Sequence, residues 1–246
     1  MTALLRTDGV VKSFGGVQAL NGCTLEVEDG TIAGLIGPNG SGKTTLFNVI
    51  TGYERADAGD VYFNGHAITN SGPGRVFGLG IGRTFQLTRI FGRLTVLENM
   101  LVASQAKSGR AAERRRAMEL LEFVGIHGHR DALAGTLSYG QRKLLELAYI
   151  LVADPQVILL DEPAGGVNPT LINLIADRIR LLNAEQGKTF LLVEHNMEFV
   201  MGLCSRVTVL DSGAVVADGP PEIIRTDQRV LDAYLGADIE ETADEQ

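Results

Sequence analysis

The segment from Gly37 to Thr44 constrains this chain more than any other part of its sequence. It reads Gly-Pro-Asn-Gly-Ser-Gly-Lys-Thr, and it directly follows the apolar run 31–36. Its three glycines allow the backbone to curl until successive N–H groups point inward, as binding of a phosphate requires. A helix is expected from Thr45, and its N-terminal end would add partial positive charge. The pattern G-x-x-x-x-G-K-[ST] between a strand and a helix therefore predicts a phosphate-binding loop.

Each position of this loop has an expected role toward a nucleotide. Lys43 can reach the β- and γ-phosphates, and the hydroxyl of Thr44 can bind Mg²⁺. A chance glycine-rich turn is the alternative, but all eight positions and both flanks match the motif. We therefore expect the chain to bind a nucleoside triphosphate. The other positions expected to contact it are Gly37, Pro38, Asn39, Gly40, Ser41, Gly42 and Thr45.

Bulk composition argues against several other classes of protein. The 246 residues are 45% hydrophobic, which suits one large α/β domain or two closely joined lobes. A net charge of −8 argues against binding of nucleic acid. Cys23 and Cys204 lie far apart and outside any C-x-x-C spacing, so we expect neither disulfides nor a zinc site. No apolar run approaches the roughly 20 residues that span a bilayer, so another chain would supply any membrane part.

The spacing of apolar residues predicts three kinds of structure along the chain. Residues 1–35 and 57–65 alternate short apolar and polar stretches, which is typical of antiparallel strands. From 96 to 151 apolar residues recur at helical spacing, which indicates a helical insertion. Short apolar runs at 157–160 and 190–193 enclose another helical pattern, and together they predict a βαβ unit of a parallel sheet.

Two adjacent carboxylates, Asp161 and Glu162, directly follow the predicted strand 157–160. They would lie at the carboxyl end of that strand, where the ligands of open α/β sheets gather. Asp161 can hold Mg²⁺ directly or through water, and Glu162 can polarise an attacking water. An Asp-Glu pair could also simply begin a loop, but the phosphate-binding loop favours the catalytic interpretation.

A third motif, Leu-Ser-Tyr-Gly-Gln over 137–141, precedes a helix that we expect to begin near Arg142. Ser138 and Gly140 could donate hydrogen bonds to a phosphate at a helix N-terminus, although an ordinary N-cap would look the same. Together with the phosphate loop and the two carboxylates, this motif resembles the ATP-binding cassette family, whose defining pentapeptide is L-S-G-G-Q. The resemblance covers nearly the whole chain.

The resemblance implies roles for further residues. Gln86 resembles the glutamine whose loop contacts Mg²⁺, the attacking water and the membrane subunit. His195 resembles the switch histidine that contacts the γ-phosphate, and Phe14 resembles the ring that stacks on adenine. Gln141 completes the set of expected nucleotide-binding residues. Without the family, Gln86 would be an unremarkable loop amide, His195 a satisfied polar residue and Phe14 a packing residue.

The resemblance also implies the fold and its division. We expect an α/β fold with a P-loop NTPase core of the RecA-like kind, an antiparallel β edge and an inserted α-helical subdomain. A single domain would cover 1–236. Residues 1–90 and 152–236 would together form the RecA-like/β lobe, residues 91–151 the helical subdomain with the pentapeptide, and residues 237–246 an acidic tail.

Departures from the family pattern are typical of one branch. Tyr139 replaces the first glycine of the pentapeptide, and Asn168 stands where many members have aspartate. With Arg-Thr-Phe-Gln at 83–86 and Ala-Tyr-Leu-Gly at 233–236, the chain is similar to ATPase subunits of branched-chain amino acid importers. Related importers of amides or urea share the pattern. These ATPases are the kind that pairs with a second, different ATPase.

The resemblance implies ATP and Mg²⁺ as cofactors and a catalytic site shared between two cassettes. Expected partners are a second ABC ATPase, identical or, preferably, different, two transmembrane permease subunits and, indirectly, a substrate-binding protein. No nucleic acid is expected. The chain would act as a peripheral protein at the cytoplasmic face of the inner membrane and be soluble when isolated. Two alternatives stay open: an ATPase that drives an iron–sulfur assembly complex, and an interaction subunit that binds ATP but barely hydrolyses it.

Overall fold

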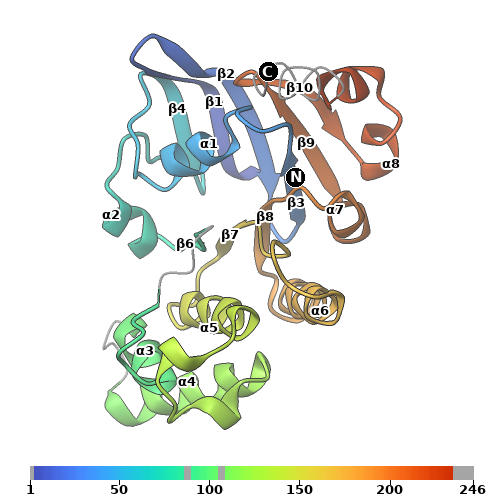
Figure 1. The fold of residues 1–246 in the computed structure, drawn as a ribbon. Helices are drawn as coiled ribbons and strands as arrows, with labels where there is room; N and C mark the ends of the chain where they lie inside the picture. Colours follow the sequence, from blue (N-terminus) through green and yellow to red (C-terminus); the bar gives the residue numbers. More distant parts are fainter. Residues whose placement is uncertain (1–2, 86–89, 105–108, 235–246) are drawn as a thin grey trace.

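The fold consists of two β-sheets and a set of helices, of which three lie together at one end (Figure 1). The computed structural model describes residues 3–85, 90–104 and 109–234. One sheet has the strand order β2-β1-β4-β5 and the other has the order β10-β9-β3-β8-β7-β6. The predicted phosphate loop, the two carboxylates and the switch histidine all follow strands of the second sheet.

The first sheet is antiparallel throughout and comes from the N-terminal part of the chain. Asn64 and Gly65 join its last two strands with φ values of 51° and 73°, as a tight hairpin turn requires. The antiparallel β edge predicted from the sequence is therefore confirmed. Its strands are β1 (Ala3–Phe14), β2 (Val17–Glu28), β4 (Ala58–Phe63) and β5 (His66–Ala67).

The second sheet is parallel except for its edge strand β10, which pairs antiparallel with β9. Helix α6 (Pro169–Gln186) connects β7 to β8, so the predicted βαβ unit is confirmed. Three neighbouring strands are buried at every position, because both faces of the sheet are covered. The strands are β3 (Ile32–Ile36), β6 (Ile81–Arg83), β7 (Val157–Asp161), β8 (Thr189–Val193), β9 (Arg206–Asp211) and β10 (Ala214–Gly219).

Each face of the parallel sheet belongs to its own buried cluster. Side chains alternate between the faces along each strand, so Leu159 and Leu191 lie in the cluster with the antiparallel sheet. Leu160 and Leu192 lie in the other cluster, with the helices. The phosphate-loop helix α1 (Lys43–Ile50) contributes to the first cluster, for example through Phe47. The sheet is thus fixed from both sides, which holds the ends of its strands in place.

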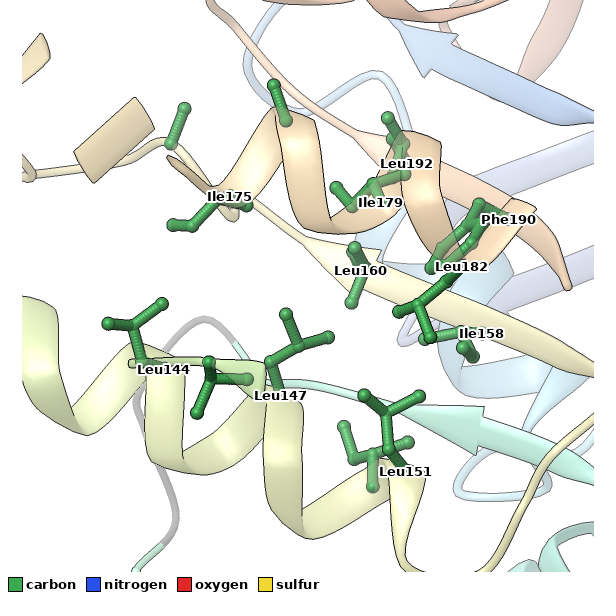
Figure 2. Packing of buried hydrophobic residues seen from close by; sticks show 14 of the residues in the cluster. Leu144, Leu147, Leu151, Ile158, Leu160, Ile175, Ile179, Leu182, Phe190 and Leu192 are labelled. Atoms are coloured by element: carbon green, nitrogen blue, oxygen red, sulfur yellow. The ribbon is translucent and has the colours of Figure 1, made fainter. Parts of the chain in front are cut away.

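Three helices fall within the predicted helical interval: α3 (Val96–Ala103), α4 (Arg110–Phe123) and α5 (Tyr139–Leu151). Leu147 and Leu151 of α5 share one buried cluster with Ile158 of β7 and Ile179 of α6 (Figure 2). Helix α5 begins at Tyr139 and not near Arg142, so that expected start was wrong by three residues. Five shorter elements complete the described part of the fold: α2 (Pro73–Gly78), α7 (Met197–Leu203), α8 (Pro221–Ile224) and two 3₁₀ turns, at 127–129 and 134–136.

Candidate nucleotide-binding site

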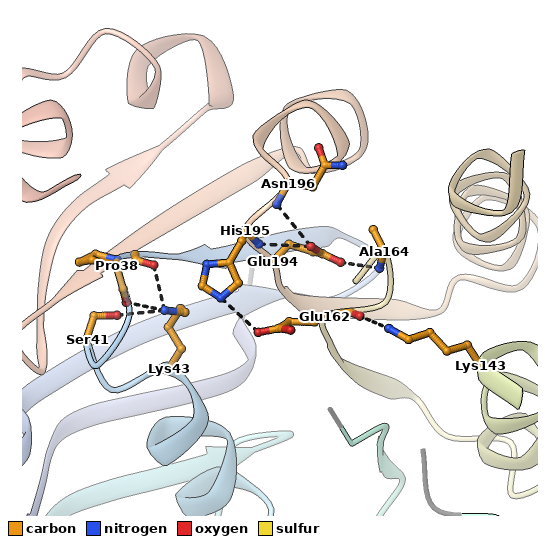
Figure 3. Close-up of polar contacts among 10 residues, drawn as sticks. Pro38, Ser41, Lys43, Lys143, Glu162, Ala164, Glu194, His195 and Asn196 are labelled. Carbon is orange, nitrogen blue, oxygen red and sulfur yellow. Dashed lines mark hydrogen bonds and ion pairs between the residues drawn. The ribbon is translucent and has the colours of Figure 1, made fainter. Parts of the chain in front are cut away.

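The loop between β3 and α1 curls around the amino group of Lys43. Its Nζ donates hydrogen bonds to the carbonyl oxygens of Gly37 at 2.8 Å and Pro38 at 2.7 Å, and it lies 3.3 Å from Ser41 Oγ (Figure 3). Burial lowers the pKa of Lys43 below its usual value, and the carboxylate of Glu162 opposes that effect. The loop therefore holds one cation among its own carbonyl groups, next to a carboxylate.

Two glycines make this loop possible. Gly37 and Gly42 have φ values of 151° and 104°, which favour glycine. A Cβ on Gly37 would lie 2.0 Å from the carbonyl oxygen of Leu210, and one on Gly42 would lie 2.4 Å from that of Ala19. Within the described residues no side chain caps the N-terminus of α1, so its first N–H groups face a possible ligand.

Glu162 and His195 meet across the ends of β7 and β8. His195 Nε2 lies 3.1 Å from Glu162 Oε1 (Figure 3). Glu162 has a φ of 49°, a left-handed conformation that costs about 1–3 kcal/mol and is concentrated at functional sites. Its N–H donates to the carbonyl of Val193 at 2.8 Å, and its own carbonyl accepts from Lys143 Nζ. The strained backbone is therefore held on both sides.

Asp161 is held by a buried ion pair with Arg83. Arg83 Nη2 lies 3.1 Å from Asp161 Oδ2, and the side chains are only 6% and 3% exposed. Arg83 Nη1 also donates to Asn48 Oδ1 at 2.6 Å and Thr51 Oγ1 at 3.1 Å. Burial raises the pKa of Asp161, while Arg83 counteracts that rise. Three aromatic rings also surround the Arg83 guanidinium. Their centres lie 5.1–6.0 Å from Arg83 Cζ, and they belong to Phe47, Tyr53 and Phe85.

One cavity of about 230 Å³ is lined by eight of the predicted site residues, and we call it the phosphate-loop cavity. Asp161 does not line it. Phe14 does not line it; its half-exposed ring lies at the end of β1, 5.0 Å from Lys12 Nζ. Gln86, expected to contact Mg²⁺ and water, lies outside the described residues. The cavity is lined by Asn39, Gly40, Gly42, Lys43, Thr44, Thr45, Glu162 and His195, with Ala19 and Val193.

The pentapeptide residues lie elsewhere, at the N-terminus of α5. The last four, 138–141, line a second cavity of about 570 Å³, which we call the signature cavity, and it shares no described lining residue with the phosphate-loop cavity. A Cβ on Gly140 would lie 2.2 Å from Leu171 Cδ2, so α5 and α6 approach closely there. Lining residues include Ser138, Tyr139, Gly140, Gln141, Gly166, Val167, Asn168, Thr170 and Leu171.

Ser138 and Gln141 form a capping box at this helix end. The N–H of Gln141 donates to Ser138 Oγ at 3.3 Å, and the N–H of Ser138 donates to Gln141 Oε1 at 3.0 Å. Gln141 Nε2 also lies 2.9 Å from His129 Nε2. The side chain of Gln141 thus has partners within the chain, whereas among the described residues Ser138 Oγ only accepts a hydrogen bond.

Four charged residues of the described part of this region were not predicted from the sequence as site residues. Glu146 and Glu194 are buried, and Arg83 and Lys143 are partly buried. Glu194 is 2% exposed, and three backbone N–H groups donate to its carboxylate. Burial raises its pKa, which those hydrogen bonds and Lys143 oppose. A charged residue directly after the fully apolar run 190–193 was the one signal that the sequence offered.

A further cavity, of about 390 Å³, lies beside the end of β6. We call it the aromatic groove. The N–H of Phe85, the last described residue before Gln86, donates to the buried carboxylate of Glu146 at 3.1 Å in this region. The groove is lined by Thr51, Tyr53, Pro73, Gly74, Val76, Phe77, Ile81, Arg83, Phe85, Phe91, Glu146, Tyr149 and Ile150.

Comparison with known proteins identifies the family to which this chain belongs. A family model described as ABC transporter matches residues 20–165, and one described as branched-chain amino acid ATP-binding cassette transporter matches residues 214–240. The chain belongs to the ABC transporter family, in its branched-chain amino acid branch. It is the ATP-binding subunit of such a transporter, and its ATP hydrolysis is coupled to transport. This outcome confirms the predicted transport ATPase over the assembly ATPase.

Two relatives illustrate the extent of the similarity. The chain is 39% identical to the probable branched-chain amino acid transport ATP-binding protein LivG of Archaeoglobus fulgidus, over 95% of this chain and 96% of the relative. It is 37% identical to the high-affinity branched-chain amino acid transport ATP-binding protein LivG of Escherichia coli, over 95% and 98%.

Solved structures confirm the predicted fold. The ADP conformation of MJ1267, described as an ATP-binding cassette of an ABC transporter, superposes with a TM-score of 0.87 at 36% identity, covering 96% of this chain and 100% of that one. The dimeric structure of MJ0796, described as a bacterial ABC transporter cassette, gives 0.80 at 25% identity, covering 88% and 98%. Among the described residues, no helix is both long and apolar enough to cross a membrane.

Proposed function

We propose that this chain powers the import of branched-chain amino acids or related amides, with Glu162 and His195 acting at the hydrolysed phosphate. The observation that carries this proposal is the 3.1 Å approach of His195 to Glu162 in the cavity that Lys43 and Thr44 also line. Glu162 accepts a proton from the attacking water, and His195 contacts the γ-phosphate. Phosphoryl transfer needs little covalent help from the protein, so these residues act through position and charge.

Lys43 and the start of α1 bind the phosphates. Lys43 Nζ exchanges its bonds to Gly37 and Pro38 for bonds to β- and γ-phosphate oxygens, which are stronger acceptors for a cation. The N–H groups at the start of α1 and the loop glycines donate to the same phosphates. Phe14, exposed at the end of β1, offers its ring for stacking on adenine.

The two described residues that we propose for Mg²⁺ are placed differently. Thr44 lines the phosphate-loop cavity, whereas Asp161 does not line it and is paired with Arg83, so Asp161 would reach the ion through water. Magnesium is commonly bound by one or two carboxylates together with substrate phosphates. The described residues hold no group of three or more His, Cys, Asp or Glu side chains that could bind a metal by themselves, which suits an ion completed by ATP. We assign its protein ligands to Thr44 and Asp161 and, from the family resemblance, Gln86. When bound, the ion neutralises charge that develops on the phosphates.

We infer that Ser138 and Gly140 complete the nucleotide site of a second cassette. Two observations support this: the signature cavity shares no described lining residue with the phosphate-loop cavity, and a dimeric cassette is among the similar structures. The Ser138 hydroxyl and the N-terminus of α5 supply donors suited to a γ-phosphate. We expect the second cassette to be a different ATPase in the cell, although an identical copy has the same complementary cavities.

We further propose that the aromatic groove receives a segment of a permease subunit. Its aromatic lining would bury apolar side chains. Phe85, which lines it, directly precedes Gln86 in the sequence, and the family resemblance assigns Gln86 to contact with the membrane subunit. Two permease subunits, and through them a substrate-binding protein, would complete the transporter. The chain would then work at the cytoplasmic face of the inner membrane.

Reconstitution tests this function. The tagged chain should copurify with two polytopic membrane proteins and a second cassette. In proteoliposomes, ATP hydrolysis by that complex should rise when binding protein loaded with leucine, isoleucine or valine is added. Copurification with soluble scaffold proteins instead, or hydrolysis indifferent to every loaded binding protein, would contradict the proposal.

A further inference from the structure

Glu194 is a buried carboxylate at the point where β8 ends, directly before His195. The residue is only 2% exposed. A buried carboxylate is costly unless hydrogen bonds offset its lost hydration. The donors that provide this compensation show what the side chain holds in place (Figure 3).

The two oxygens of Glu194 bind two different loops. Oε1 accepts from the N–H of Ala164 at 2.5 Å, in the loop that follows Glu162. Oε2 accepts from the N–H groups of His195 and Asn196 at 3.2 and 3.4 Å, in the loop that follows β8. One carboxylate therefore ties together the two backbone segments whose side chains, Glu162 and His195, approach to 3.1 Å.

Lys143 reinforces the same arrangement from α5. Its Nζ donates to the carbonyl oxygen of Glu162 and lies 5.5 Å from the centre of the Tyr139 ring. Among the carboxylates that oppose the lowering of the Lys143 pKa by burial, Glu194 has the largest effect. The negative charge of Glu194 is thus compensated by Lys143, which also donates a hydrogen bond to the backbone of the loop after β7.

We propose that Glu194 is a positioning residue for hydrolysis, which sets the approach of His195 to Glu162 by fixing the loops that carry them. This inference rests on the proposed function, because it needs Glu162 and His195 to act at the γ-phosphate. A carboxylate that served folding alone would support the same hydrogen bonds, but its loss would not depend on whether His195 is present.

A change at Glu194 should affect turnover and leave nucleotide binding unchanged. The hydrogen bonds of Glu194 go to the loops after β7 and β8, whereas Lys43 is the first residue of α1, after β3. Glutamine at position 194 has nearly the same shape, but its NH₂ group faces an N–H donor, so one loop loses its acceptor. Turnover should therefore fall while the affinity for ATP stays.

The experiment measures kcat and the Kd for ATP of the full chain, under conditions in which the wild type hydrolyses ATP. The variants are Glu194→Gln, Glu194→Asp, His195→Ala and the double variant Glu194→Gln/His195→Ala. Glu198→Gln is the matched control, because this exposed glutamate in the first turn of α7 undergoes the same chemical change. Thermal unfolding of each variant reports on folding.

We expect Glu194→Gln to lower kcat by roughly 10- to 100-fold, the scale of a misplaced catalytic group, with the Kd for ATP within about twofold of the wild type. With His195→Ala already present, the same change should lower kcat by less than about twofold further. Glu194→Asp keeps the charge but is too short to reach both loops, so its kcat should lie in between. Glu198→Gln should behave as the wild type.

Three outcomes would overturn the inference: a wild-type kcat for Glu194→Gln, an equal loss of kcat with and without His195, or a loss of ATP affinity that matches the loss of kcat. If Glu194→Gln does not fold, kcat is instead compared between the single variant Glu194→Asp and the double variant Glu194→Asp/His195→Ala. Failure of the proposed function is seen separately, as wild-type turnover in the single variant His195→Ala, and it would overturn this inference as well.

Discussion

The phosphate-loop cavity and the signature cavity of this chain are built in opposite ways. The first is lined by ionisable groups, with Lys43 opposite Glu162 and His195, and hydrogen bonds within the chain hold each of them. The second is larger, and its described lining carries no charged side chain. It offers a hydroxyl and the N-terminus of α5. The first cavity thus has the groups for bond cleavage and the second only donors for an anion, so each supplies what the other lacks.

The two regions also differ in what maintains them. The phosphate-loop cavity depends on the buried ion pair of Arg83 with Asp161 and on buried carboxylates that accept hydrogen bonds from backbone N–H groups, so removal of one partner leaves an uncompensated charge. The signature cavity depends on a capping box and on the close contact of Gly140 with Leu171, which are local features of α5 and α6. We therefore expect substitutions in the first region to have the larger effects.

The largest effect should come from Arg83→Met. The variant leaves Asp161 buried without its cation, and loss of one partner of a buried pair typically costs about 3–5 kcal/mol in the free energy of unfolding. Denaturant unfolding measures it. Arg115→Met, which removes an exposed i,i+4 pair on α4, should change that free energy by less than about 0.5 kcal/mol. Equal effects of the two variants would show that the buried pair does not maintain the first region.

Glu162→Gln should come next. It removes the acceptor of the water proton but keeps the shape of the cavity, so turnover should fall by about 100-fold or more while ATP still binds. Phosphate release and equilibrium dialysis measure the two quantities. Glu185→Gln, at an exposed position near the end of α6, is the control. Turnover like that of the wild type in Glu162→Gln would remove this residue from its proposed role.

Lys43→Ala should act on binding. A charge-assisted hydrogen bond contributes about 1.5–3 kcal/mol, so the affinity for ATP should fall by roughly 10- to 100-fold. Equilibrium dialysis with the isolated chain measures it, beside Lys188→Ala, which removes a lysine paired with Asp154 far along the chain from the loop. Unchanged ATP binding in Lys43→Ala would contradict the assignment of the phosphate loop.

Ser138→Ala should have the smallest effect. Loss of an N-cap costs about 1 kcal/mol of stability, and loss of one hydrogen bond to a phosphate should lower turnover by about fivefold. The affinity of the isolated chain for ATP should not change, because Ser138 does not line the phosphate-loop cavity. Ser138→Thr, which keeps a hydroxyl and the cap, should stay near the wild type. If the isolated Ser138→Ala variant bound ATP more weakly, Ser138 would contact the nucleotide of its own chain, which contradicts the separation of the two cavities.

The same contrast explains what the sequence could predict. The phosphate loop and the pair Asp161–Glu162 are contiguous, and their flanking strands are apolar runs, so local patterns were sufficient. Arg83 and Asp161 are 78 residues apart, and their pairing depends on the order β8-β7-β6, which no local pattern reveals. The strand β6 has only three residues, too few for a recognisable alternation.

The first residues of two helices were also predicted inexactly from the sequence. Helix α5 begins at Tyr139 because Ser138 and Gln141 cap each other, a signal that the sequence contained and that the expected start near Arg142 did not use. Helix α1 begins at Lys43, two residues before the expected Thr45, because the left-handed Gly42 turns directly into it. The role of Glu194 required the folded loops, since its acceptor oxygens join segments about 30 residues apart.

Mixing two defective variants tests most directly whether two cassettes share each nucleotide. Lys43→Ala disables the phosphate-loop cavity, and Ser138→Asp keeps a good N-cap but places a negative charge in the signature cavity. Each alone should be inactive. A one-to-one mixture should regain roughly a quarter of wild-type turnover, because half of the randomly formed pairs contain one intact shared site. Wild-type turnover by Ser138→Asp alone, or a mixture that stays inactive where the wild-type chain hydrolyses ATP, would contradict the shared site.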